Sequence, residues 1–259
     1  MKKIIFRFII LIILICIAIV GVFGVAGYSM YKNALKETSF DDKINEIRSE
    51  ANYTKIDDVA QTYKDAVVAV EDHRFYQHGG IDLWAIMRAI ARNIKYSELL
   101  EGGSTITQQL AKNTYFTQSK KMTRKVAEGF MAIKYEKNLS KNEILELYIN
   151  TSYFGNGYYN IKEASLGYFG KLPSELNDYE ATMLAGVPNA PSVYAPTVNF
   201  KLASERQVQV LNKMDKYNYI TEEERKETKV LSTEIITNKT YTIGETQKRL
   251  IQVKVKSGI

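Results

Sequence analysis

The sequence predicts a mainly α-helical protein in which one N-terminal transmembrane helix precedes a folded helical domain. The segment Phe8 to Ala26 is apolar apart from its glycines. As a helix it is long enough to cross the roughly 30 Å hydrocarbon layer of a bilayer. All four prolines fall between residues 173 and 196, so this helix breaker is absent from the chain before them. Helical capping signals then recur through the rest of the chain.

The expected anchor covers residues 8–27 and follows a short N-terminus of residues 1–7. Lys2, Lys3 and Arg7 precede the apolar run, and positively charged flanks tend to stay in the cytoplasm. The alternative is a cleaved signal peptide, although the apolar run is longer than the roughly 7–15 residues of such peptides. We therefore expect a single-pass protein of the cell membrane with its domain outside the cytoplasm.

Three further segments follow the anchor. Residues 28–59 are polar and are expected to form a linker, and residues 60–230 are expected to form the main domain. Residues 231–259 are richer in Thr, Val and Ile, which suggests either a short strand pair or a loosely ordered tail.

Helix starts in the domain are indicated by capping boxes, in which a side-chain oxygen and an acid or amide three residues later satisfy free backbone N–H groups. The pairs are Thr105 with Gln108, Ser140 with Glu143, Asn177 with Glu180, and Thr221 with Glu224.

The distribution of charge argues against a nucleic-acid partner. The formal charge is +6, but four of the 35 basic residues (Lys2, Lys3, Arg7 and Lys32) flank the apolar segment. The remainder of the chain carries 31 basic and 29 acidic residues and is nearly neutral. The single cysteine, Cys16, lies inside the apolar segment, so the domain has no disulfide, Cys nucleophile or Cys-ligated metal site.

Two short motifs are rich in groups that carry chemistry. Glu71 to Gly80 reads EDHRFYQHGG and follows the apolar run Ala66 to Val70. Gly102 to Asn113 reads GGSTITQQLAKN and concentrates hydroxyls, amides and a lysine. Together the motifs suggest a site for a polyhydroxylated, negatively charged substrate. Glu71 is the natural candidate for a proton acceptor.

Helix geometry sorts the second motif into two faces. If Thr105 caps a helix, Gln109, Lys112 and Asn113 share one face, and the opposite face buries Ile106 and Leu110. Ser104 and Thr105 are either substrate contacts or caps only.

Downstream, Arg124 and Glu128 are four residues apart and share a helix face. They form either an ordinary ion pair or part of the site. Lys125 and Lys134 are further candidate contacts.

These stretches resemble the first two motifs of the peptidoglycan glycosyltransferases (family 51), which occur alone as monofunctional enzymes or as the transglycosylase domain of class A penicillin-binding proteins. Three further stretches match in the same order: RKVAE at 124–128, KNEILELYIN at 141–150, and YFGNGYYNIKEASLGYFGK at 153–171. The loop PNAPSVYAP at 188–196 also looks like the family, and the resemblance covers about residues 60–215.

The resemblance implies a lysozyme-like helical lobe with a smaller membrane-proximal lobe. It also implies that the chain joins lipid II, an undecaprenyl-diphosphate disaccharide-pentapeptide, into β-1,4-linked glycan strands with inversion at the donor's anomeric carbon. Glu71 would take the proton of the acceptor's 4-hydroxyl, with Glu128 as the second catalytic carboxylate. The remaining expected site residues bind substrate: Ser104, Thr105, Gln109, Lys112, Asn113, Arg124, Lys125 and Lys134. Glu71, Lys112, Arg124 and Glu128 are expected to share one cleft.

The sequence requires no cofactor, but the resemblance allows a divalent cation, Mg or Mn, to serve the diphosphate through Glu128. The implied partners are lipid II, the growing glycan strand, the membrane, and other proteins of cell-wall synthesis or division.

Two other functions stay open. One is a membrane-anchored peptidoglycan hydrolase or lytic enzyme with Glu71 as its acid, and the other is a non-catalytic scaffold that binds wall precursors.

One departure from the family is Asn160, where a glycine is usual. We expect Asn to keep that turn, because Asn tolerates a left-handed backbone.

Overall fold

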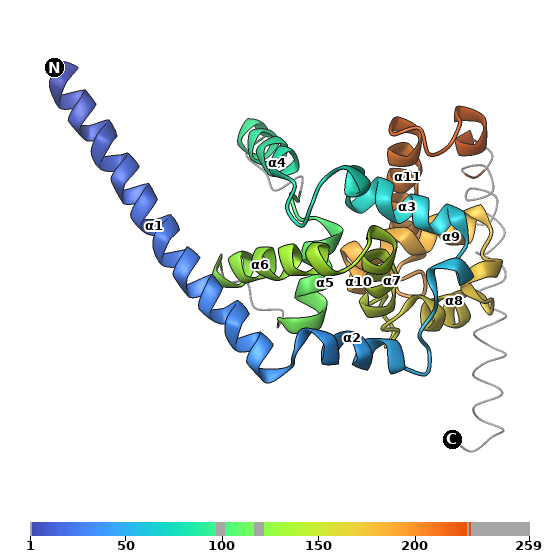
Figure 1. Ribbon diagram of the computed structural model, residues 1–259. Coiled ribbons are helices and arrows are strands. Elements are labelled where there is room, and N and C mark those ends of the chain that lie inside the picture. Colours follow the sequence, from blue (N-terminus) through green and yellow to red (C-terminus); the bar gives the residue numbers. More distant parts are fainter. Residues whose placement is uncertain (1, 97–101, 117–121, 227, 229–259) are drawn as a thin grey trace. The chain divides into compact units, whose positions relative to one another are not determined.

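The computed structural model describes residues 2–96, 102–116, 122–226 and 228, and every regular element in this part of the chain is a helix (Figure 1). For residues 2–5, 9, 12, 13 and 16 only the backbone is described. The predicted mainly α-helical fold is confirmed. The tail at 231–259, with its expected strand pair, lies outside the described residues.

The chain divides into two compact units. Unit 1 comprises Met1–Ile56 and Arg74–Ser152, and unit 2 comprises Asp57–His73 and Tyr153–Ile259. The helices of unit 1 are α1 (Lys2–Glu37), α2 (Phe40–Ser49), η2 (Phe75–Gln77), α4 (Leu83–Tyr96), α5 (Ile106–Tyr115), α6 (Met122–Asn138) and α7 (Lys141–Thr151). Those of unit 2 are α3 (Gln61–Glu71), α8 (Ile161–Phe169), η3 (Pro173–Glu175), α9 (Asp178–Gly186), η4 (Val187–Asn189), α10 (Pro191–Tyr194) and α11 (Phe200–Lys216). The short turn η1 (Ile56–Asp58) joins the two units along the chain.

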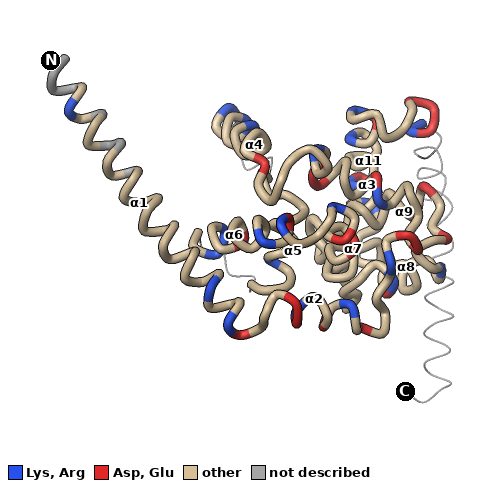
Figure 2. Tube along the Cα trace, in the orientation of Figure 1, with Lys and Arg blue, Asp and Glu red and all other residues tan. Residues whose placement is uncertain are grey.

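Helix α1 runs for 36 residues, and its C-terminal part packs along α6 (Figure 1). Charged residues occur only toward its two ends (Figure 2). Within the part of the chain that the structure describes, no helix combines the length and the apolarity that crossing a membrane requires. The predicted transmembrane anchor is therefore not confirmed.

The core of unit 1 lies between α5, α6 and α7. The side chains of Ile106 and Leu110 on α5 are fully buried, as predicted from the apolar face of that helix. Met131 on α6 and Ile144 on α7 complete the same apolar contact region, and both are also fully buried. Phe75, from the first motif, belongs to this core as well. One face of α5 is thereby fixed in the core, which leaves its polar face for the site.

Residues 28–59 are not the linker that their polarity predicted. Helix α1 continues to Glu37, and α2 follows after the N-cap residue Ser39, whose side chain accepts a hydrogen bond from the Asp42 N–H. Phe40, Ile44 and Ile47 are buried. Because these residues are four and three apart, a mostly polar helix still presents an apolar stripe to the protein.

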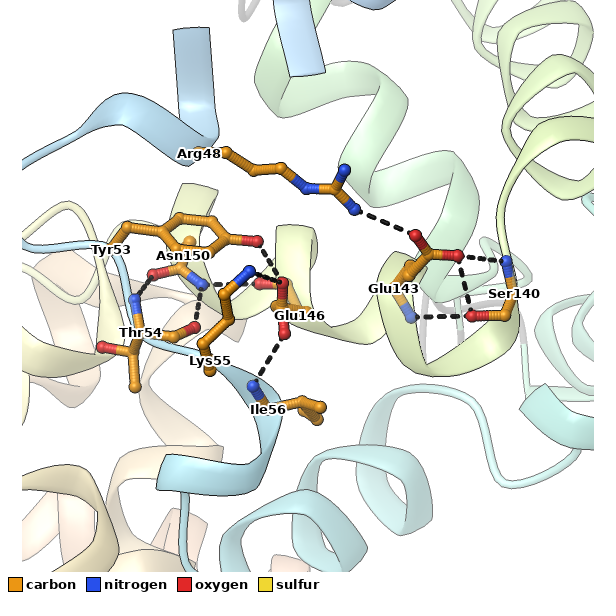
Figure 3. Close-up of polar contacts among 9 residues, drawn as sticks. All are labelled: Arg48, Tyr53, Thr54, Lys55, Ile56, Ser140, Glu143, Glu146 and Asn150. Atoms are coloured by element: carbon orange, nitrogen blue, oxygen red, sulfur yellow. Dashed lines mark hydrogen bonds and ion pairs between the residues drawn. The ribbon is translucent and has the colours of Figure 1, made fainter. Parts of the chain in front are cut away.

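Helix α7 holds the chain segment that leads into unit 2 (Figure 3). The Glu146 carboxylate accepts hydrogen bonds from the Tyr53 hydroxyl and from the Ile56 N–H, the latter at 2.8 Å. The side chain of Asn150 bonds both the N–H and the carbonyl of Thr54, each at 2.8 Å. Burial, and then the neighbouring Glu146 carboxylate, raise the pKa of Tyr53. The stretch KNEILELYIN at 141–150, which supplies Glu146 and Asn150, therefore fixes residues 53–56 onto α7.

The core of unit 2 lies between α3, α9 and α11. Tyr63 on α3, Leu184 on α9, and Val210 and Met214 on α11 are fully buried. Gln207 donates hydrogen bonds to the Tyr179 carbonyl (2.7 Å) and to the Thr182 hydroxyl (2.9 Å). Together these contacts join α9 to α11.

All four predicted capping boxes are present. Thr105, Ser140 and Asn177 cap α5, α7 and α9, and each makes the reciprocal pair of bonds with the residue three positions later. Thr221 and Glu224 form the same pair of bonds, at 3.2 and 2.7 Å. Capping boxes could be found from sequence because both partners lie within one helical turn.

Asn160 does not keep a left-handed turn, so that expectation was wrong. Its backbone is extended, with φ −152° and ψ 168°, and its side chain caps α8 by accepting the Glu163 N–H at 2.9 Å. The left-handed positions of this motif are Gly155, Asn156, Gly157 and, at the end of α8, Gly170. Asn160 therefore serves as an N-cap, a position that asparagine favours.

Truncation of Glu146 tests the contact between α7 and residues 53–56. We expect Glu146→Ala to lower the free energy of unfolding by about 2–4 kcal/mol, because it leaves a half-buried hydroxyl and a backbone N–H without their acceptor. The matched control is Glu205→Ala, which removes an exposed carboxylate with one ion pair at 4.0 Å and should stay within about 0.5 kcal/mol. Denaturant unfolding of the full chain in detergent measures both, and equal effects would contradict the assignment.

Candidate active site

Thr105 acts in the structure as a helix cap. It is 1% exposed, its hydroxyl donates to the Gly80 carbonyl at 2.8 Å, and it accepts the Gln108 N–H at 3.0 Å. A Cβ on Gly80 would lie 2.6 Å from the Ala132 backbone carbon on α6, so only glycine allows this close approach. Of the two roles expected for Thr105, the geometry supports the cap and not the substrate contact. It ties the end of the first motif to the start of α5.

The polar face of α5 presents the expected residues. Gln109, Lys112 and Asn113 are all half-buried, whereas Ile106 and Leu110 are fully buried. The Tyr148 hydroxyl of α7 donates to Gln109 Oε1 at 3.3 Å. Two amides and an ammonium group are therefore held on one helix face next to the core. These groups suit hydroxyl and phosphate oxygens respectively.

Glu128 is the centre of a chain of charged contacts in unit 1. The residue has no solvent exposure, and its Oε1 lies 3.1 Å from Arg124 Nε. Lys125 Nζ donates to Glu128 Oε2 at 2.8 Å and to the Ser104 hydroxyl at 2.6 Å. Four of the predicted site residues thus come together, and the cations are preorganised by a buried carboxylate that compensates their charge.

The surroundings of Glu128 do not fit a divalent cation. Each of its oxygens already faces a cationic group within 3.1 Å. A metal ion at this carboxylate would face two positive charges in a buried region, where charge repulsion is strong. Glu128 is therefore a poor metal ligand in this arrangement, and it serves better to hold Arg124 and Lys125 in place.

Lys134 does not join this group. Its ammonium lies 4.7 Å from the centre of the Phe40 ring on α2, a cation–π contact. The sequence analysis expected Lys134 to be a further substrate contact near Arg124. The structure instead uses it to attach α2 to α6.

Two cavities adjoin the cationic residues. Lys125, Ser104 and Gln108 line one of about 490 Å³, whose remaining walls are mainly apolar side chains of α4 and α6. Arg124 lines the second, of about 410 Å³, together with residues of α1 and the end of α5. Arg124 and Lys125 therefore flank Glu128 but face different spaces.

Glu71 is the last residue of α3 in unit 2, and its side chain is 10% exposed. Its Oε1 lies 3.6 Å from Nη2 of Arg206, which is 13% exposed. Burial, and then the negative charge of Glu71, raise the pKa of the fully buried Tyr63 hydroxyl on the same helix. The candidate base thus has an arginine within ion-pair distance.

The pairing of Glu71 with Arg206 was not predicted from the sequence. Residues 72–205, including a whole segment of unit 1, separate the two along the chain, so no local spacing connects them. His73, two residues beyond Glu71, stacks on Tyr217 with ring centroids 3.9 Å apart. Asp72 is the C-cap residue of α3 and is 7% exposed. Glu71 belongs to unit 2 and Lys112, Arg124 and Glu128 to unit 1, so the expected shared cleft stays a prediction.

Buried charged side chains beside cavities are the usual signature of a candidate enzyme active site. The comparisons with known proteins agree with this class. Residues 40–215 match the Transglycosylase family. The chain belongs to that family.

Curated relatives carry the names of penicillin-binding proteins. Penicillin-binding protein 1A of Neisseria flavescens is 46% identical over 173 residues, which are 67% of this chain and 22% of that protein. Penicillin-binding protein 1F of Bacillus subtilis (strain 168) is 43% identical over 169 residues, or 65% of this chain and 24% of the relative. The chain therefore spans about a quarter of the length of these relatives.

A solved structure is also similar, namely the crystal structure of penicillin-binding protein 1A from Haemophilus influenzae. It is 25% identical with a TM-score of 0.41, and the match covers 68% of this chain and 17% of that one. The family assignment stands on the sequence match over residues 40–215.

Removing Glu128 should destabilise unit 1. Glu128→Ala leaves the Arg124 and Lys125 charges close together without their buried counter-charge, and we expect a loss of about 3 kcal/mol. The exposed Glu223 provides the control substitution Glu223→Ala, which should change stability by less than about 0.5 kcal/mol. Denaturant unfolding in detergent measures both. If the two variants proved equally stable, the buried pairing would not hold this region together.

Proposed function

We propose that the chain is a peptidoglycan glycosyltransferase that polymerises lipid II into β-1,4-linked glycan strands and releases undecaprenyl diphosphate. The observation that carries this proposal is the match of residues 40–215 to the transglycosylase family. The matched range contains all the motifs that hold the candidate site residues. The 46% sequence identity over 173 residues between this chain and penicillin-binding protein 1A of Neisseria flavescens supports the same function.

The proposed reaction needs a base, a cationic environment for the departing diphosphate, and groups that hold sugars. The Glu71 carboxylate takes the proton of the acceptor's 4-hydroxyl as that oxygen forms a bond to the donor's anomeric carbon. The bond from this carbon to the phosphate oxygen breaks, and the diphosphate leaves with the electron pair. Attack opposite to the leaving group inverts the anomeric centre.

The cationic residues of unit 1 are assigned to the diphosphate. Lys112, Arg124 and Lys125 supply the positive charge, and the fork of the arginine matches phosphate geometry. Glu128 holds Arg124 and Lys125 in position through its two ion pairs. Gln109 and Asn113 offer amide groups to sugar hydroxyls.

We also propose that the protein acts at the membrane, with residues 8–27 as an anchor and the rest of the chain outside the cytoplasm. The apolar sequence of this segment and the charges around it support that arrangement. Helix α4 offers a second contact, because five large apolar side chains on it are more than half exposed: Leu83, Trp84, Met87, Ile90 and Ile94. Its only charged residues are basic (Figure 2), as in helices that lie on anionic membrane surfaces.

The decisive experiment compares the full chain with Glu71→Gln on purified lipid II in detergent. Loss of the acceptor for the proton should reduce polymer formation by a factor of about 100 or more while lipid II binding is retained. Gel separation of the glycan products measures the first quantity, and a binding assay with labelled lipid II measures the second. Glu205→Gln, an exposed carboxylate on α11, is the control and should polymerise normally.

Other outcomes would overturn the proposal in distinct ways. Release of sugars from finished cell wall without polymer formation would indicate a hydrolase. Lipid II binding without any turnover by the parent chain would indicate a scaffold. Full polymerisation by Glu71→Gln would remove Glu71 from its role as the base.

A further inference from the structure

We propose that Arg206 is a positioning residue for Glu71, which holds the carboxylate in one orientation at the end of α3. The inference rests on the proposed function, in which Glu71 is the base, and adds a residue to that site. Arg206 acts through Glu71 and is assigned no contact with substrate. All the contacts that support this role lie within unit 2.

Glu71 occupies a place where a carboxylate needs a cation. It ends α3, so it lies at the negative end of the helix dipole. Its side chain is only 10% exposed, and removal of a charge from water costs free energy unless a partner compensates it. The guanidinium of Arg206, with Nη2 at 3.6 Å from Oε1, is such a partner.

The guanidinium is itself fixed on three sides. Its Nε donates to the Gly186 carbonyl at the end of α9 at 3.4 Å, and Nη1 donates to Gln209 Oε1 on α11 at 3.0 Å. The Tyr194 ring of α10 lies 5.8 Å from the guanidinium carbon, within reach of a cation–π contact. Because Arg206 is held in this way, it defines a fixed direction for the Glu71 side chain.

Two further features of the sequence, Gly186 and the loop at 188–196, help to place Arg206. A Cβ on Gly186 would lie 2.9 Å from Arg206 Cγ, so glycine at this position makes room for the arginine. The proline-containing loop at 188–196, part of the family resemblance, forms η4 and α10 and thereby places Tyr194 beside the guanidinium. Both features support Arg206 without reaching Glu71 themselves.

A positioning role predicts a specific kinetic signature. If Arg206 only orients the base, its loss should slow the chemical step and leave lipid II binding almost unchanged. A base displaced by about 1 Å can cost a factor of about 100 in rate. We therefore expect Arg206→Gln to lower kcat by about 10- to 100-fold while KM changes by less than about threefold.

The experiment measures kcat and KM of the full chain for purified lipid II in detergent, together with thermal melting of each variant. Arg206→Lys retains the positive charge but loses the fork, so it should recover part of the kcat lost in Arg206→Gln. The matched control is Arg225→Gln in the same unit. Arg225 also pairs with a carboxylate, Asp215, at 3.2 Å, and its Nη1 donates to Asn212 at 3.1 Å. It should keep kcat within about twofold.

A second variant keeps the test valid if Arg206→Gln melts below the assay temperature. Tyr194→Leu leaves both charges in place but removes the aromatic support of the guanidinium, and it should lower kcat in the same direction by a smaller factor, about 3- to 10-fold.

Different results would exclude the role of Arg206 and the proposed function of the chain. If the parent chain polymerises lipid II and Arg206→Gln loses no more kcat than Arg225→Gln, Arg206 has no positioning role. A rise in KM with unchanged kcat would likewise overturn it, because that result indicates substrate binding. If the parent chain makes no polymer at all, the proposed function itself is wrong.

Discussion

A carboxylate that is removed from water must be compensated by a cation or by several hydrogen-bond donors, and this constraint governs the described part of the protein. Glu128 lies between Arg124 and Lys125, and Glu71 lies against Arg206. Asp82, 2% exposed, accepts the Trp84 and Ala85 N–H groups at the start of α4 and pairs with Arg74 at 3.6 Å. For Glu71 and Asp82 the cation comes from another segment of the chain, whereas both cations of Glu128 lie on its own helix. The buried acids therefore determine where loops and helix ends are fixed.

The same constraint distinguishes the two carboxylates of the candidate site. Glu128 has two cations on its own helix, at three and four residues before it, so its compensation is complete within α6. Glu71 has no basic residue in the last turn of its helix and depends on an arginine from α11. A carboxylate with cations at 3.1 and 2.8 Å is suited to holding them in place, whereas the longer contact of Glu71 with Arg206, at 3.6 Å, suits a carboxylate that is proposed to accept a proton. The structure thereby gives physical content to the different roles proposed for the two acids.

What could be predicted from the sequence depended on the distance between partners. Capping boxes such as Ser140 with Glu143, and the ion pair of Arg124 with Glu128, were predictable because one helical turn contains both partners. The pairing of Glu71 with Arg206 was not, because the partners are on separate helices and no spacing rule links them. The role of Asn160 was misjudged because a side chain suited to a left-handed turn is equally suited to an N-cap. Residues 28–59 were misread because three apolar side chains suffice to bury one face of an otherwise polar helix.

The attachment of residues 53–56 to α7 has a consequence for variation in length. Connecting segments ordinarily accept insertions and deletions, because their backbone groups face water. Here the Thr54 backbone and the Ile56 N–H are bonded to Asn150 and Glu146, so one added or lost residue would shift every donor away from its acceptor. Homologous chains should accordingly conserve the number of residues from Tyr53 to Ile56 more strictly than their sequence, because two backbone N–H groups and one carbonyl set this register.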